Sequence, residues 1–165
     1  MTGQTIVARE PTPGSVPPLL AALRGANVHP RPIWLMRQAG RYLPEYRALR
    51  SASGGFLAMV YDSEAACEIT LQPVRRFGLD GAILFSDILI VPHAMGQALN
   101  FVAGEGPRLA PRLADHALAD LVAAPERLAP IYTTVRAVRA ALAADKVLLG
   151  FAGSPLTVAT YMVAG

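Results

Sequence analysis

Three short apolar runs are spaced along this chain, at residues 33–36, 82–85 and 146–151. Continuous apolar runs of this length are typical of strands that are buried on both faces, as in a parallel sheet covered by helices. Each run is followed by a stretch with helical signals, and this alternation of strand and helix indicates an α/β fold. The runs therefore predict a parallel sheet whose strands alternate with helices.

The segments between the runs carry the start and stop signals of helices. Pro44 suits the first turn of a helix, because it has no N–H to satisfy there. Asp62 or Ser63 can cap a longer helix that ends at Gly78. The other expected elements are helices or helical turns at residues 17–24, 88–95, 115–121, 125–144 and 156–164, an apolar turn at 56–61, and a β-hairpin insertion formed by 98–102 and 107–109.

Composition places the chain among globular proteins. Of its 165 residues, 53% are hydrophobic and 16% are charged, which argues against disorder. No apolar run reaches the length of about 18 residues that a membrane-spanning helix needs. Residues 1–14 are polar and rich in proline and glycine, which predicts a flexible tail and no export signal. The net charge of +3 comes without a basic stripe, so we expect no nucleic-acid partner.

The single cysteine, Cys67, cannot form an internal disulfide. A lone cysteine is consistent with a reducing compartment, and we expect the protein to act in the cytoplasm. We interpret Cys67 itself as a small buried hydrophobic residue within a helix. His29 and His116 have no spacing with Cys67 or a carboxylate that suggests a metal site, so no metal is expected.

Arginines gather around the first apolar run. Arg37 follows the run directly, and Arg41 follows it after a short loop. Arg47 and Arg50 then lie three residues apart, on one face of the next helix. A guanidinium group presents a planar fork of donors that matches carboxylate or phosphate oxygens. The pattern predicts a site for an anion that carries several acidic groups.

Polar residues also follow the second and third runs. Ser86 and Asp87 come after the second run, and Ser154 comes after the third. Because the carboxyl ends of parallel strands meet at one edge, we expect these residues to share a site with the arginines. Asp87 stands between apolar residues, so its carboxylate could face a cation that develops during a reaction. A helix N-cap or a structural partner for an arginine remains open for the same residue.

The other candidate residues also allow a structural interpretation. Arg37 and Arg41 could form structural ion pairs. Arg47 is expected to be a solvated surface residue. Tyr161 lies in an apolar helix, where a tyrosine usually belongs to the core. His93 is expected to have no chemical role.

Three sequence motifs resemble those of the uroporphyrinogen decarboxylase family. They are MRQAGRYLPEYR, LFSDILIVPHAMG and GFAGSPLTVATYMVAG, and they occur in the family's order. The similarity runs from about residue 17 to the last residue. The resemblance implies a (β/α)₈ TIM barrel, a fold that takes about 250 residues. We therefore expect residues 15–165 to be the N-terminal portion of one barrel domain, with its first three or so βα units.

The resemblance also implies a reaction that needs no cofactor. The four acetate side chains of uroporphyrinogen III become methyl groups, which gives coproporphyrinogen III in haem biosynthesis. Asp87 matches the aspartate that stabilises the protonated pyrrole, and Arg37 matches an anchor and proton-relay group. The residues implied to bind the substrate are Arg37, Gln38, Ala39, Gly40, Arg41, Arg50, Asp87 and Tyr161.

Two alternatives remain open on the sequence. One is a zinc-dependent methyltransferase that acts on corrinoid or cobalamin and shares the barrel. The other is a barrel piece without activity that only binds or dimerises. We expect the 165-residue chain alone to be inactive and the full-length form to be a homodimer, as the resemblance implies.

Overall fold

The computed structural model describes residues 16–36, 38–102, 106–115 and 118–164. The predicted tail at 1–14, Arg37 and the hairpin tip lie outside the described residues. Among the residues that are described, no helix has the length and apolar character needed to cross a membrane.

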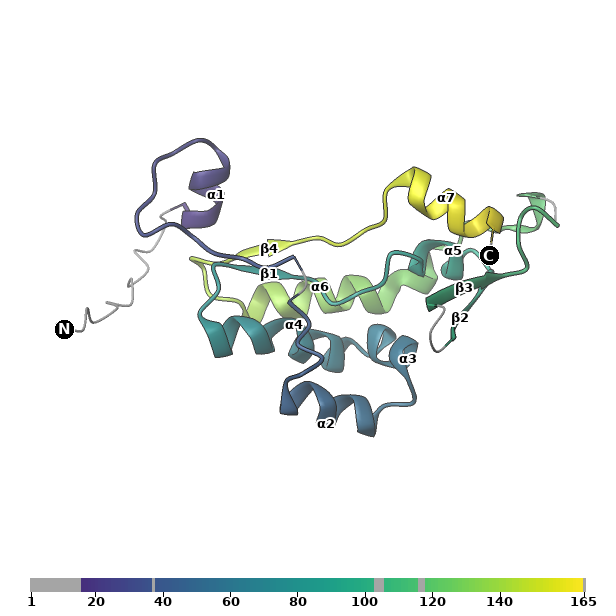
Figure 1. Ribbon diagram of the computed structural model, residues 1–165, viewed down its shortest axis with the longest axis horizontal. Coiled ribbons are helices and arrows are strands. Elements are labelled where there is room, and N and C mark those ends of the chain that lie inside the picture. The colour runs from purple at the N-terminus through teal and green to yellow at the C-terminus, as the bar shows by residue number, and fades with distance from the viewer. Residues whose placement is uncertain (1–15, 37, 103–105, 116–117, 165) are drawn as a thin grey trace.

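The centre of the fold is a pair of parallel strands. Strand β1 (Gly81–Ile83) pairs with β4 (Val147–Leu149), and Gly81 lies opposite Val147. Helices α4 (Ser63–Phe77) and α6 (Ala129–Ala141) pack against each other on one side of the pair, as Figure 1 shows. This arrangement confirms the predicted α/β class and two of the three predicted strands.

Helix α4 begins and ends where its sequence signals predict. The Asp62 carboxylate accepts hydrogen bonds from the N–H groups of Glu64 and Ala65, which satisfies two of the free donors of the first turn. Gly78 ends the helix at a φ of 64°, in the left-handed region that favours glycine. Residues on the inner face of α4, such as Ile69, are buried in the main core.

The smaller elements surround this centre. The antiparallel hairpin of β2 (Ala98–Val102) and β3 (Gly106–Ala110) confirms the predicted insertion. Helix α7 (Pro155–Ala164) lies against β3. The other helices are α1 (Pro18–Leu23), α2 (Pro44–Ala52), α3 (Phe56–Tyr61), α5 (Ile90–Ala94) and the 3₁₀ turns η1 (Leu118–Asp120) and η2 (Pro125–Leu128).

Two local predictions are wrong, and a third is tested only in the described part of its range. Residues 56–61 form the helix α3 where a turn was expected, and this helix packs its Met59 and Val60 into the core. The helix predicted at 125–144 is divided into η2 and the shorter α6. Of the short helix expected at 115–121, the described part contains only a single 3₁₀ turn at 118–120.

The predicted first strand, at residues 33–36, is the largest correction. These residues are extended and exposed and form no strand ladder, with Met36 74% accessible. The segment touches the start of β1 through the Ile33 carbonyl, which accepts from the Asp80 N–H at 2.8 Å. It crosses close over Gly81, where an added Cβ would lie 3.3 Å from the Cβ of Trp34. The exposed fractions, from 37% for Trp34 to 74% for Met36, show that no described element covers the apolar side chains of this segment.

Candidate functional site

The loops that follow β1 and β4 lie against each other at the carboxyl ends of the two strands. The pairing extends past β1, where the Leu84 N–H donates to the Leu149 carbonyl at 3.0 Å. In the next turns, a Cβ added to Gly153 would lie 3.1 Å from the Cβ of Ile88, so a side chain there would force the loops apart. The two strands therefore end at one edge, as predicted, and the residues beside Ile88 and Gly153 are neighbours.

Asp87 lies in the loop after β1 and is half-buried. Its Oδ1 accepts a hydrogen bond of 2.8 Å from the Leu89 N–H, just ahead of α5. Desolvation raises the pKa of the Asp87 carboxyl group, and the Leu89 N–H offsets part of that effect. Among the described residues, none forms an ion pair with Asp87. Asp87 is also not the N-cap of α5, because Leu89 holds that position.

Ser86 is the second polar group of this loop. Its side chain is buried, and its Oγ has no hydrogen-bond partner among the described residues. A buried hydroxyl without a partner is uncommon in folded proteins, because its desolvation is not compensated. Thr70 does not supply the bond, because its Oγ1 donates to the Ala66 carbonyl and accepts from the Phe85 N–H. Beside Asp87, Ser86 thus offers a donor that is not otherwise engaged.

Gln38 holds the loop of residues 38–43 against the edge of β1 through its side chain. Its Nε2 donates to the Gly81 carbonyl at 2.6 Å, and its Oε1 accepts from the Ile83 N–H at 2.8 Å. The side-chain amide therefore pairs with β1 as a neighbouring strand would. Gln38 is buried, with 6% of its surface exposed. No sequence signal identifies this role, because nothing local shows that the amide reaches residues more than 40 positions away.

The loop after Gln38 is tight and then opens to the surface. The Leu43 N–H donates to the Gly40 carbonyl at 2.7 Å, and a Cβ on Gly40 would lie 2.5 Å from the Leu43 side chain. Gly40 is therefore needed for this close approach. Ala39 and Arg41 are exposed. The loop thus turns at Gly40 and presents Arg41 to solvent.

The arginines differ in what the structure reveals. Arg37, a predicted site residue, lies outside the described residues. The side chains of Arg41 and Arg50 are exposed and have no partner in the part of the chain that is described. The same holds for Arg47, whose expected place on the surface is confirmed. None of the three forms the structural ion pair that was the alternative for Arg41.

Tyr161 lies on α7, half-buried against the small cluster of Leu89, Leu99 and Leu109. Leu89 is also the residue whose N–H binds Asp87, so Tyr161 packs close to the loop after β1. Ser154 starts α7, where its Oγ accepts from the Thr157 N–H at 3.3 Å. The structure thus brings residues 86–89 together with Gly153 and the cluster that contains Tyr161.

Cys67 lies on α4 and His93 lies on α5. Cys67 is a free cysteine, partly buried against the core, and burial raises the pKa of its thiol. In the described residues, no group of three or more His, Cys, Asp or Glu side chains gathers as a metal site would require. His93 Nδ1 forms a hydrogen bond of 2.8 Å with the Tyr61 hydroxyl.

Comparison with known sequences gives consistent matches. The family profile described as uroporphyrinogen decarboxylase (URO-D) matches residues 15–165. A protein of Rhizorhabdus wittichii named uroporphyrinogen decarboxylase is 72% identical over 153 residues, which cover 93% of this chain. Proteins of the same name from Novosphingobium aromaticivorans and Chelativorans sp. are 71% and 55% identical over 148 residues each.

The chain covers less than half of each of these relatives. The chain spans 44% of the length of the Rhizorhabdus protein and 43% of the Novosphingobium and Chelativorans proteins. Among solved structures, a methyltransferase from Methanosarcina mazei aligns with a TM-score of 0.69 and 21% identity. The alignment covers 88% of this chain and 44% of that one. At this identity the likeness concerns the fold alone.

Proposed function

The chain belongs to the uroporphyrinogen decarboxylase family, and from this premise we propose that it supplies the first part of an enzyme that decarboxylates uroporphyrinogen III. The proposed product is coproporphyrinogen III, in which all four acetate side chains have become methyl groups. The observation that carries the proposal is the half-buried Asp87, which has no cation partner among the described residues and lies at the strand edge where the loops after β1 and β4 meet.

The proposed reaction uses the pyrrole ring as its own electron sink. A proton adds to a ring carbon, and the ring becomes a cation. The bond between the acetate methylene and its carboxylate then breaks, CO₂ leaves, and the electron pair moves into the ring. A proton adds to the methylene carbon and the ring carbon loses its proton, so each cycle consumes one proton and leaves a methyl group. No cofactor is required for this sequence.

Asp87 is the proposed stabiliser of the ring cation. Two opposite unit charges about 4 Å apart, at an effective dielectric constant near 20, interact by about 4 kcal/mol. If this interaction arises mainly in the transition state, it accelerates the reaction by about three orders of magnitude. Burial favours this role, because desolvation raises the pKa of Asp87 and a cation in the site would offset that cost of ionisation.

The arginines are the proposed anchors of the substrate carboxylates. Arg41 and Arg50 suit this role because their guanidinium groups are exposed and unengaged by the described residues. Arg37 is proposed as a further anchor that passes protons through water. A direct role as a general acid does not suit it, because an arginine pKa exceeds 12. Ala39 and Gly40 are proposed to contact the substrate through the backbone.

Gln38 and Tyr161 complete the proposed binding set. Gln38 fixes the loop to β1 through its side chain, which leaves its backbone for the substrate. Tyr161 is proposed to place its hydroxyl near a substrate carboxylate, since its ring packs beside the Asp87 loop. We further propose that the full-length protein is a single (β/α)₈ barrel and a homodimer that acts in the cytoplasm. Family membership supports this proposal, and the lone Cys67 is consistent with a reducing compartment.

The test is turnover by a chimera that joins this chain to the remaining part of the Rhizorhabdus wittichii relative. We expect the chimera to convert uroporphyrinogen III into coproporphyrinogen III without added metal or cofactor, and the 165-residue chain alone to be inactive. The Rhizorhabdus protein is the positive control. A chimera that folds cooperatively but gives no product, while the control gives product, would contradict the proposal.

A further inference from the structure

The loop of residues 38–43 is attached to the rest of the fold at both of its ends. At its start, the buried side chain of Gln38 binds the backbone of β1. At its other end, the chain enters α2 directly. Arg41 lies between these two ends and is exposed to solvent. The place of Arg41 therefore depends on the position of α2 as well as on the bonds of Gln38.

Apolar packing holds α2 through one side of its first turn. Tyr46 is its one buried residue, and the Tyr46 ring packs edge-on against Phe85 with the ring centroids 6.3 Å apart. Leu43, just ahead of the helix, is buried in the same core. Hydrophobic contacts are not directional, so they keep the helix near the core without fixing its orientation. A directional contact is needed to set how α2 lies against its neighbour α4.

An ion pair between Glu45 of α2 and Arg76 of α4 supplies that directional contact. Arg76 Nε donates to Glu45 Oε1 at 2.9 Å, and Arg76 Nη2 donates to Glu45 Oε2 at 3.0 Å. Two parallel bonds of this kind fix the plane of the carboxylate relative to that of the guanidinium group. The bond with Arg76 also lowers the pKa of Glu45 to about 2, so the carboxylate stays charged at neutral pH.

Helix α4 is also attached to the loop that carries Asp87. The Thr70 hydroxyl of α4 accepts a hydrogen bond of 2.9 Å from the Phe85 N–H, two residues before Asp87. Thr70 is buried, with 2% of its surface exposed. Helix α4 is therefore a common support for Asp87 and, through the pair of Arg76 with Glu45, for the helix that follows the Arg41 loop.

A second arginine–glutamate pair on α4 lacks this connection. Arg75 donates to the two carboxylate oxygens of Glu68 at 3.2 and 2.8 Å. Both of these residues belong to α4, so their pair joins no other element. Arg75 and Arg76 are thus adjacent arginines with similar bonds, and of these two pairs the one with Arg76 reaches α2.

We propose that Arg76 is a positioning residue of the uroporphyrinogen site. Through Glu45 it sets the orientation of α2, and hence the place of Arg41 relative to Asp87. The inference rests on the proposed function, because it takes Arg41 as an anchor of a substrate carboxylate. Arg76 and Glu45 themselves do not touch the substrate. An exposed ion pair contributes little free energy, so we expect effects of a few fold on substrate binding.

The first test measures KM and kcat for uroporphyrinogen in the full-length chimera. We expect Arg76→Gln and Glu45→Gln each to raise KM by about three- to fivefold and to change kcat by less than about twofold. Arg75→Gln removes the same charge from the adjacent position and should leave KM unchanged.

The sign of the Glu45→Gln effect separates positioning from long-range attraction. Removal of a negative charge would by itself draw a poly-acid more strongly and lower KM. Positioning instead predicts a higher KM, because the bidentate pair with Arg76 is broken. A lower KM for Glu45→Gln, or a rise for Arg75→Gln equal to that for Arg76→Gln, would overturn the proposal.

Hydrogen exchange of the same variants tests the inference without turnover. Backbone amides of residues 41–52 should exchange about threefold faster in Arg76→Gln and Glu45→Gln than in the parent, while those of α6 stay unchanged. Arg75→Gln should match the parent throughout. Faster exchange at 41–52 in a chimera that makes no product would support the link to α2 and count against the proposed function alone. Unchanged exchange at 41–52 in both variants would overturn the inference, even in an active chimera.

Discussion

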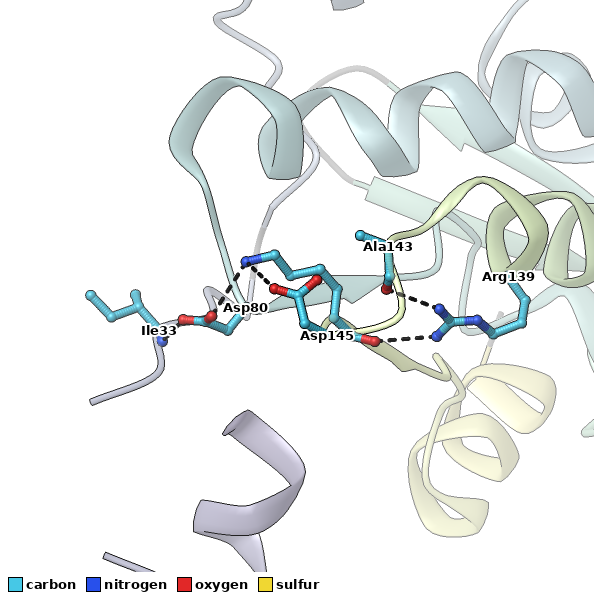
Figure 2. A network of polar contacts seen from close by, with 6 residues as sticks. Ile33, Asp80, Arg139, Ala143 and Asp145 are labelled. Atoms are coloured by element: carbon cyan, nitrogen blue, oxygen red, sulfur yellow. Dashed lines mark hydrogen bonds and ion pairs between the residues drawn. The ribbon is translucent and has the colours of Figure 1, made fainter. Parts of the chain in front are cut away.

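The two ends of β1 each carry an aspartate, and the two aspartates have opposite surroundings. At the start of the strand, Asp80 accepts from the Ile33 N–H at 2.7 Å and lies 3.4 Å from the Lys146 ammonium group. Lys146 also lies 3.7 Å from Asp145, and Arg139 donates to the Ala143 and Lys146 carbonyls in the turn after α6, as Figure 2 shows. At this end of the sheet, the side chains of Asp80, Asp145, Lys146 and Arg139 therefore all have partners.

The other end of the strand lacks such pairing. Asp87 has one N–H from Leu89 and no cation among the described residues, and Ser86 has no partner. In barrels built from parallel strands, the amino ends of strands serve stability and the carboxyl ends serve chemistry. The contrast between Asp80 and Asp87 fits that division. The missing partner among the described residues and the desolvation, and not the residue type, make Asp87 the candidate site residue of the two.

The largest expected effect concerns two single variants of the chimera, Asp87→Asn and Asp80→Asn. Asp87→Asn should lower kcat for uroporphyrinogen by about three orders of magnitude, because the counter-charge for the ring cation is lost. Asp80→Asn should leave kcat within a few fold, since it lies at the opposite end of β1. Steady-state assays of coproporphyrinogen formation measure both. Similar losses of kcat in the two variants would contradict the assignment of chemistry to the carboxyl end of β1 and of stability to its amino end.

The next comparison concerns Gln38. We propose that it positions the substrate-binding residues by holding the loop of residues 38–43 against β1. Gln38→Met removes both bonds to β1, and we expect KM for uroporphyrinogen to rise by about tenfold while kcat changes less. Gln72→Met is the matched control, since Gln72 is a buried glutamine of α4 whose side chain donates, among the described residues, only to Glu68. An equal rise in KM for both variants would show a general loss of stability and no positioning role.

At the paired end, the expected effect is on stability. Lys146→Met leaves Asp80 and Asp145 without their cation, and we expect the free energy of unfolding to fall by about 1–3 kcal/mol. Arg75→Met breaks an exposed pair with Glu68 and should cost less than about 1 kcal/mol. Urea denaturation measures both variants. A smaller loss for Lys146→Met than for Arg75→Met would contradict the assignment of this network to stability.

The smallest expected effect is the pH dependence of stability. The pKa of Asp87 is raised in the folded state, so the folded protein binds that proton more tightly and loses stability as pH rises through the window above the unfolded pKa. Asp87→Asn removes this loss, so the variant should gain stability relative to the parent as pH rises from acid to neutral. Thermal unfolding at a series of pH values measures the difference.

Glu45 provides the opposite sign as a control. Its hydrogen bond with Arg76 lowers its pKa to about 2, so its contribution is present above the unfolded pKa and is lost as pH falls toward 2. Glu45→Gln should therefore lose stability relative to the parent at neutral pH and match it in acid. If Asp87→Asn showed the sign expected for Glu45→Gln, the desolvation of Asp87 would be refuted.

Local signals in the sequence identify much of the fold. Asp62 and Gly78 mark the ends of α4 because a cap and a left-handed residue act within one turn. The wrong prediction at 33–36 has a tertiary cause. Its apolar run is real, but burial requires a covering element, and none of the described elements lies over it.

The candidate site was only partly predictable for the same reason. The position of Asp87 after an apolar run indicated the strand edge, which the parallel pairing of β1 and β4 bears out. The amide of Gln38 reaches β1 across more than 40 residues of sequence, and no local pattern shows such a contact. The hydrogen bond between Tyr61 of α3 and His93 of α5 joins residues 32 positions apart, and no local pattern shows that these two helices meet.

The most direct test of the central claim is a crystal structure of the full-length chimera with coproporphyrinogen bound. The account predicts that the pyrrole N–H groups lie within about 3 Å of the Asp87 carboxylate, as hydrogen bonds require. It also predicts that carboxylates of the ligand contact Arg41 or Arg50. A tetrapyrrole bound with its ring nitrogens away from Asp87 would contradict the account.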